Sequence, residues 1–150
     1  DTYTPEREPH VRSTVAHAVD MGRLIDQLAG RVSHGVDIES GYGGTRPAPH
    51  LVDGVVFGDD TRVGHQFWFN AEVSNAVRQN GASFAVVSAE PIELPKELRQ
   101  LQAINVVAPQ AVGDAHAVVV RPDRYVAAVA SDARHLSEIA DWLAELLTAN

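Results

Sequence analysis

The sequence contains no cysteine. This absence excludes disulfide bonds, thiolate metal sites and cysteine nucleophiles. It fits a reducing compartment, so we expect a cytoplasmic protein. The apolar residues make up 45% of the 150 positions, but they never form the run of about 20 that a membrane-spanning helix needs. The polar opening DTYTPEREPH also lacks the apolar core of a signal peptide. We therefore expect no contact with a membrane.

Basic charge is scarce as well. The chain has 12 Lys and Arg against 20 Asp and Glu, a formal net charge of −8. Nucleic acids and anionic membranes bind to basic faces, so we expect neither as a partner. The length suits one domain with a short appendage.

The common catalytic patterns are absent too. His10 and His17 are seven residues apart, but no HExxH pattern or third ligand completes a metal site. The adjacent acids at 59–60 lie in FGDDTRVG, which is typical of a solvated turn. In the glycine-rich stretch 40–50, Arg46 occupies the place of the third glycine of a dinucleotide fingerprint. We therefore predict no catalytic, cofactor-binding or metal-binding residue in this chain.

The N-terminal part has the apolar spacing of a helix over residues 9–29. Pro9 suits a first helical turn and Gly30 a stop, although an earlier turn from Thr4 with a bend at Pro9 is the alternative. Residues 30–50 are predicted to be a linker because their second half is rich in glycine and proline. One apolar stripe on this helix has to pack on the rest of the chain or on a missing part of the protein; its members are Val11, Val15, Ala18, Gly22, Ile25 and Ala29.

From residue 51 the pattern changes to short apolar runs between turns. We predict strands within 50–59, 65–70, 83–89 and 104–109, a hairpin with arms 116–121 and 124–130, and helices over 71–80, 95–102 and 131–150. The buried face of the last helix is predicted to be Leu136, Ile139, Ala140, Leu143 and Leu147. This order favours an α/β fold: a thioredoxin-like three-layer sandwich with a mixed β-sheet, preceded by an N-terminal helix.

The hairpin VVVRPDRYVAAVA carries the clearest local signal. Pro122 presets the second position of a turn, Asp123 suits the third, and Arg124 is expected to open the second strand. Both arms are apolar on both faces, which predicts a sheet covered by helices on each side. Arg121, Asp123 and Tyr125 are the candidate interdomain contacts, which would tie this domain to a missing part of the protein. A local salt bridge between Arg121 and Asp123 across the turn is the alternative.

Three segments resemble one enzyme family. VRPDRYVA resembles the VRPDG-aromatic-VA motif near the C-terminus of flavin-dependent aromatic-ring hydroxylases, the relatives of phenol hydroxylase and 3-(3-hydroxyphenyl)propionate hydroxylase; Arg124 stands where that motif has glycine. RPAPH, residues 46–50, resembles the entry to their C-terminal domain. The N-terminus resembles the end of their catalytic part at Asp1, Tyr3, Glu6, Arg7, Pro9, His10, Met21, Gly22 and Arg23.

The resemblance implies a parent enzyme that uses FAD, NAD(P)H and O₂ to hydroxylate a phenolic ring. It divides this chain into the terminal helix of the catalytic part (1–29), a linker (30–50) and a thioredoxin-like C-terminal domain without redox cysteines (51–150). Such a domain would have a structural or assembly role and would hold no cofactor. The expected partners are the FAD- and substrate-binding part of the parent and a second copy paired through the N-terminal helix. The alternative is a free-standing, redox-inactive thioredoxin-like binding or dimerisation module.

Overall fold

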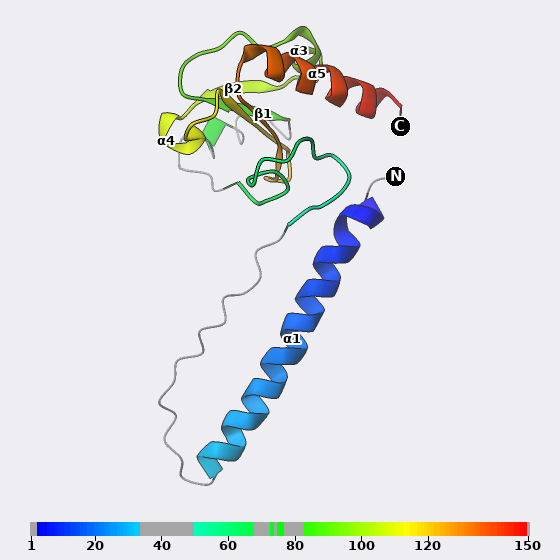
Figure 1. The fold of residues 1–150 in the computed structure, drawn as a ribbon, viewed down its shortest axis with the longest axis vertical. Coiled ribbons are helices and arrows are strands. Elements are labelled where there is room, and N and C mark those ends of the chain that lie inside the picture. Colours follow the sequence, from blue (N-terminus) through cyan, green and yellow to red (C-terminus); the bar gives the residue numbers. More distant parts are fainter. Residues whose placement is uncertain (1–2, 34–49, 68–72, 74, 77–82, 150) are drawn as a thin grey trace.

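The computed structural model describes residues 3–33, 50–67, 73, 75–76 and 83–149, and it has an α/β fold with an N-terminal helix. Figure 1 shows a long helix, α1 (Tyr3–Ser33), projecting from a body built on one β-sheet. The body contains β1 (Ala85–Ser88), α3 (Lys96–Gln100), β2 (Ile104–Val107), α4 (Pro109–Val112), β3 (Ala117–Val120), β4 (Val126–Ala130) and α5 (Ala133–Thr148).

The sheet is mixed, with the strand order β2-β1-β3-β4. β1 and β2 are parallel, whereas β3 runs antiparallel to both β1 and β4. Every residue of β1, β3 and β4 is buried, as the unalternated apolar runs predict for a sheet covered on both faces.

Two layers of side chains enclose the sheet. On one face, α5 and α3 bury Leu98, Leu136, Ile139 and neighbours against alternate strand residues. The other face is covered by α4, by the helical residue Val73 and by the non-helical Val63. Helices therefore cover one face of the sheet. The other face is covered partly by helix and partly by irregular backbone. On α5, four of the five predicted buried residues are buried, but Leu147 near the helix end is 39% exposed.

The N-terminal helix is longer than predicted. It begins at Tyr3 and ends at Ser33, so Pro9 lies inside the helix instead of in its first turn. An internal proline removes one backbone hydrogen bond. The turn that precedes Pro9 stays helical because Glu6 and Arg7 are held by ion pairs with the body. Among the described residues, no helix combines the length and hydropathy needed to cross a bilayer.

The strands predicted within 50–59 and 65–70 are wrong where the structure describes them. Over 50–67 only isolated bridges form, His50 with His65, Phe57 with Ala128 and Gln66 with Tyr125. Glycines at 54, 58 and 64 have φ angles of +91°, +91° and +76°, and such backbone interrupts a strand. Most of the helix predicted over 71–80 lies outside the described residues, as do residues 68–70 and 34–49. The predicted linker start is wrong, because residues 30–33 still belong to α1.

Candidate functional site: an ion-pair network between α1 and the β3–β4 turn

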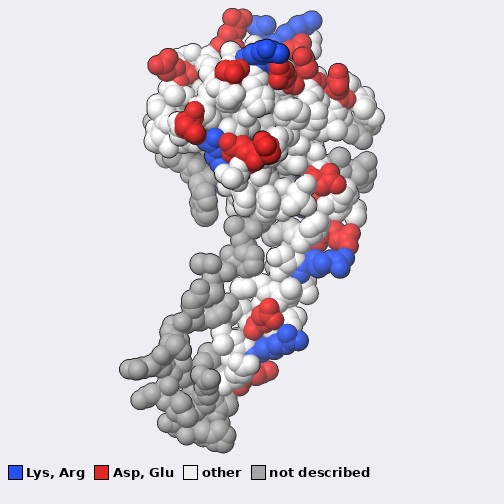
Figure 2. Space-filling model, viewed as in Figure 1, with Lys and Arg blue, Asp and Glu red and all other residues white. Residues whose placement is uncertain are grey.

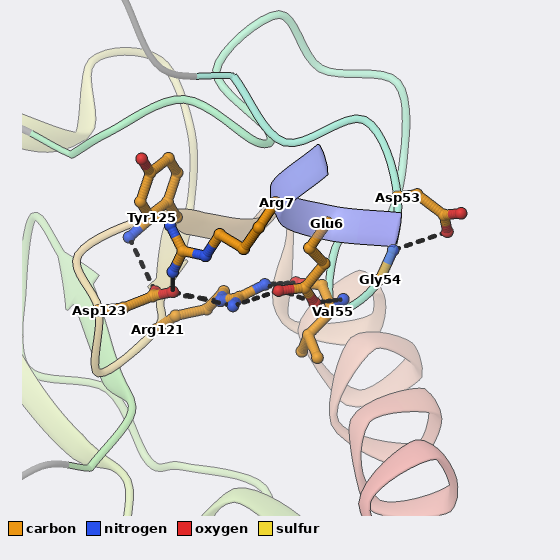
Figure 3. Close-up of polar contacts among 8 residues, drawn as sticks. All are labelled: Glu6, Arg7, Asp53, Gly54, Val55, Arg121, Asp123 and Tyr125. Carbon is orange, nitrogen blue, oxygen red and sulfur yellow. Dashed lines mark hydrogen bonds and ion pairs between the residues drawn. The ribbon is translucent and has the colours of Figure 1, made fainter. Parts of the chain in front are cut away.

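Arg121, at the end of β3, binds Glu6 in the first turns of α1 (Figure 3). Its Nη1 donates to Glu6 Oε1 at 3.1 Å and its Nη2 to Glu6 Oε2 at 2.9 Å. This is the bidentate geometry in which a guanidinium binds a carboxylate most strongly. The side chains of Arg121 and Glu6 are only 10% and 4% exposed. Desolvation offsets much of the attraction in a pair so well shielded from water, but loss of either partner would leave a buried charge, so the pair fixes where the helix docks.

Asp123 binds a second edge of the Arg121 guanidinium. Arg121 Nε donates to Asp123 Oδ1 at 3.1 Å, and Arg121 Nη2 donates to Asp123 Oδ2 at 2.9 Å. Arg7 of α1 also donates to Asp123 Oδ2, at 2.8 Å, and its guanidinium carbon lies 5.4 Å from the ring centre of Tyr125. That position is within range of a cation–π contact. Glu6, Arg7, Arg121 and Asp123 form the four-residue network, which carries two charges of each sign.

The turn between β3 and β4 fixes the geometry of the network. The N–H of Arg124 donates to the carbonyl of Arg121 at 3.0 Å, with Pro122 and Asp123 at the two central positions. Arg124 has φ +73° and the register shifts next to Val120, so a left-handed residue and a bulge follow the turn. The prediction that Arg124 opens the second strand is wrong, since β4 begins at Val126. A non-glycine residue occupies the position where left-handed backbone is needed.

A third segment completes the site. The N–H of Val55 donates to Glu6 Oε1 at 2.9 Å, and the Val55 carbonyl accepts from Arg121 Nη1 at 3.4 Å. Gly54 precedes it with φ +91°, and a Cβ there would overlap the Glu6 carboxylate. The backbone at 54–55 can approach Glu6 this closely only because residue 54 is glycine.

The electrostatics of the site favour a permanent contact over chemistry. Burial by itself would lower the pKa of Arg121, but the hydrogen bond with Glu6 and the charge of Asp123 outweigh it, so that pKa is raised. The four charges sum to zero and the guanidinium already meets two carboxylates. An arginine engaged in this way joins two segments of the chain and is not available to a substrate anion.

A second ion pair lies in the loop 50–67 and connects that loop to α4. Arg62 donates to both carboxylate oxygens of Asp60 at 2.8 Å and to the Val112 carbonyl of α4 at 2.8 Å. The Arg62 hydrogen bonds lower the pKa of Asp60 to about 2. The predicted solvated turn at 59–60 is thus partly tied to α4. No described contact joins the carboxylates of Asp59 and Asp60, as an acid–base pair would require.

The histidines of the loop stack against each other. The rings of His50 and His65 are 4.1 Å apart and nearly parallel. Burial lowers the pKa of His65, and the charge of His50 lowers it further. Within the described ranges, no group of three or more His, Asp or Glu side chains is placed to hold a metal ion.

All three predicted contact residues lie in this site. Arg121 and Asp123 bind α1, and they also bind each other across the turn, so the predicted local salt bridge is confirmed. Their contact with the missing part stays a prediction. Tyr125 is buried at 6% exposure beneath Arg7. Glu6 and Arg7 were not among the predicted contact residues, although both fall in the segment that resembles the hydroxylases. Glu6 and Arg7 carry adjacent, opposite charges that complement those of Arg121 and Asp123. That charge pattern is the sequence signal that could have indicated the contact.

Comparisons with protein-family models, with curated proteins and with solved structures found no match to this chain.

Proposed function

We propose that this chain is the C-terminal portion of a flavin-dependent aromatic hydroxylase. In that enzyme the FAD- and substrate-binding part, which uses NAD(P)H and O₂ to hydroxylate a phenolic ring, precedes the chain. The chain itself holds no cofactor. Its four-residue network fastens the terminal helix of the catalytic part to a thioredoxin-like domain that lacks redox cysteines.

One observation carries the proposal: the two segments that resemble the hydroxylases meet in space. Glu6 and Arg7 lie in the N-terminal segment, and Arg121 and Asp123 lie in VRPDRYVA. They are 115 and 116 residues apart in sequence, yet they form a buried bidentate pair and a second ion pair. Two motifs related only by chance would have no reason to bind each other. A joint between catalytic part and C-terminal domain gives both motifs one shared role.

Two features of the body support the same proposal. The strand order β2-β1-β3-β4, with a parallel β1–β2 pair, an antiparallel hairpin and a closing α5, agrees with a thioredoxin-like arrangement. Arg124 has φ +73° at the motif position where the hydroxylases have glycine. The turn therefore keeps the backbone that glycine favours even though the residue differs.

The test is to express the complete reading frame that contains this chain. We expect a yellow protein that retains FAD on gel filtration, consumes NAD(P)H only when a phenol is present, and adds one oxygen atom to the ring by mass spectrometry. The isolated chain at equal concentration should be colourless. A complete protein without flavin, or with flavin but no phenol-dependent oxidation across a panel of ring substrates, would overturn the proposal.

One observation favours the free-standing binding or dimerisation module instead. Val11, Val15 and Ile25 on α1 are 56%, 57% and 59% exposed, which is the surface that such a module would offer. The coding sequence upstream of Asp1 separates the two functions, because only the hydroxylase requires a glycine-rich FAD fingerprint there.

A further inference from the structure

The exposed apolar side chains of the described chain concentrate on α1. Val11, Val15, Val19 and Ile25 are 48–59% exposed, whereas the described contacts of α1 with the body come from Glu6 and Arg7 in its first turns. Figure 2 shows small groups of charged side chains along α1 with uncharged surface between them. Folding of the chain thus leaves these four apolar side chains in water, although burial of each would gain about 1.5–3 kcal/mol.

The apolar stripe that the sequence places on α1 has the spacing of a seam between paired helices. Its members fall at positions 11, 15, 18, 22, 25 and 29, so steps of four and three residues alternate along the whole stripe. Each pair of a four-residue and a three-residue step is one seven-residue heptad, the repeat that keeps one seam facing a partner helix. Small residues occupy the middle, Ala18 and Gly22, and a Cβ on Gly22 would meet nothing within 4 Å. Two helices can therefore approach closely at the centre.

We propose that the stripe binds a second copy of this chain, with the two α1 helices antiparallel. An antiparallel pair related by a twofold axis at residue 20 places Val11 opposite Ala29 of the second copy. The same register places Val15 opposite Ile25 and Ala18 opposite Gly22. Every apolar position of one stripe then faces an apolar position of the other.

The charges that flank the seam select the antiparallel direction. Arg12 and Asp26 lie on the same side of the stripe, one residue beyond Val11 and Ile25. In the antiparallel register Arg12 lies beside Asp26 of the second copy, and the twofold axis repeats this pair. Val19, on that side, meets its own copy. A parallel pair would instead bring Arg12 beside Arg7 of the second copy, a like-charge contact. Flanking charges of this kind set the orientation of paired helices.

The shape of the molecule agrees with that direction. The body is fixed to the first turns of α1 by Glu6, and the helix extends about 45 Å at 1.5 Å per residue (Figure 1). Antiparallel helices carry the two bodies to opposite ends of the pair. Parallel helices would crowd both bodies at one end. The proposal rests on α1 of this chain; in the hydroxylase proposed above, where α1 ends the catalytic part, that part would compete with the second copy for the same stripe.

The test is sedimentation equilibrium of the full chain and of two charge reversals, Arg12→Asp and Asp26→Arg. We expect the unsubstituted chain to dimerise reversibly. Each single reversal turns both flanking attractions into repulsions and should raise the dimer Kd about tenfold or more. An equimolar mixture of the two variants should dimerise again. In the mixed pair the introduced aspartate of one chain lies beside the introduced arginine of the other, and the remaining Asp26 lies beside the remaining Arg12. Asp20→Arg, on the outward face with the same change in charge, should leave Kd unchanged.

Three results would overturn the proposal. A monomeric unsubstituted chain at every concentration excludes self-association. Single variants that dimerise as well as the unsubstituted chain exclude the seam. Single variants that are weakened but not rescued by mixing exclude the antiparallel register. Circular dichroism of each variant checks that α1 stays helical, and since both substituted side chains are exposed on a helix, loss of folding is not expected.

Discussion

Replacement of Arg121 by methionine would leave the Glu6 carboxylate without its main partner. A buried charge deprived of its partner costs about 3–5 kcal/mol. Glu6 can avoid that cost if the first turns of α1 leave the body. Leaving sacrifices the hydrogen bond from Val55, worth about 1.5–3 kcal/mol. It also sacrifices the Arg7–Asp123 pair, which is about 30% exposed on each side and worth at most about 1 kcal/mol. The substitution therefore removes about 3–5 kcal/mol of the free energy that favours the docked state, so we expect α1 to detach far more often while the sheet stays folded.

Native-state hydrogen exchange measures this detachment directly. The amide of Val55 donates to Glu6 at 2.9 Å, so its protection reports the docked state. In Arg121→Met we expect that protection to disappear, while the amides of β3, which pair within the sheet, exchange as before. The double variant Glu6→Gln/Arg121→Met removes both charges, and glutamine retains an oxygen for Val55. It should recover part of the protection.

Two outcomes would refute this reasoning. Unchanged protection of Val55 in Arg121→Met would mean that other contacts hold the first turns of α1. Additive effects of Glu6→Gln and Arg121→Met on the free energy of unfolding would mean that the two side chains do not interact in solution.

Three further outcomes follow from the loop and the turn. Gly54→Ala should destabilise the protein by about 1–3 kcal/mol more than Gly58→Ala in urea unfolding, since both have φ +91° but only a Cβ at 54 overlaps Glu6; equal losses would contradict the close approach. Arg124→Gly should be more stable than Arg124→Ala by about 1 kcal/mol, because φ +73° strains alanine and not glycine; a more stable alanine variant would show that the turn relaxes. The lowered pKa of His65 means that its contribution to stability is complete above the usual value of 6.5 and is lost as the pH falls below it. Urea midpoints from pH 7.5 down to 5 should therefore fall less in His65→Phe than in the unsubstituted chain.

Burial was the part of the fold that the sequence predicted best. The runs that became β1, β3 and β4 are apolar at every position, and a run without alternation has to be covered on both faces. The face of α5 followed from the spacing of Leu136, Ile139, Ala140 and Leu143. These signals are local, so no knowledge of neighbouring segments was needed.

The errors occur where tertiary contacts override a local preference. Segment 50–59 has the composition of a strand, but Gly54 and Gly58 adopt positive φ, and Gly54 does so next to a helix that is distant in sequence. Pro9 predicts a helix start, yet α1 begins six residues earlier because the body holds Glu6. Neither partner can be recognised from the few residues on either side of it.

In the candidate site, a short motif determines one side of a long-range contact. The turn at Pro122 holds the Arg121 guanidinium against Asp123, so one edge of the guanidinium is fixed by contacts within the turn itself. That pre-organisation lowers the entropy lost when a carboxylate binds the remaining edge. The motif therefore predicted that Arg121 contacts another segment without identifying that segment. Glu6 supplies that carboxylate at 115 residues' separation, and the glycine beside it admits the backbone that completes its hydrogen bonds.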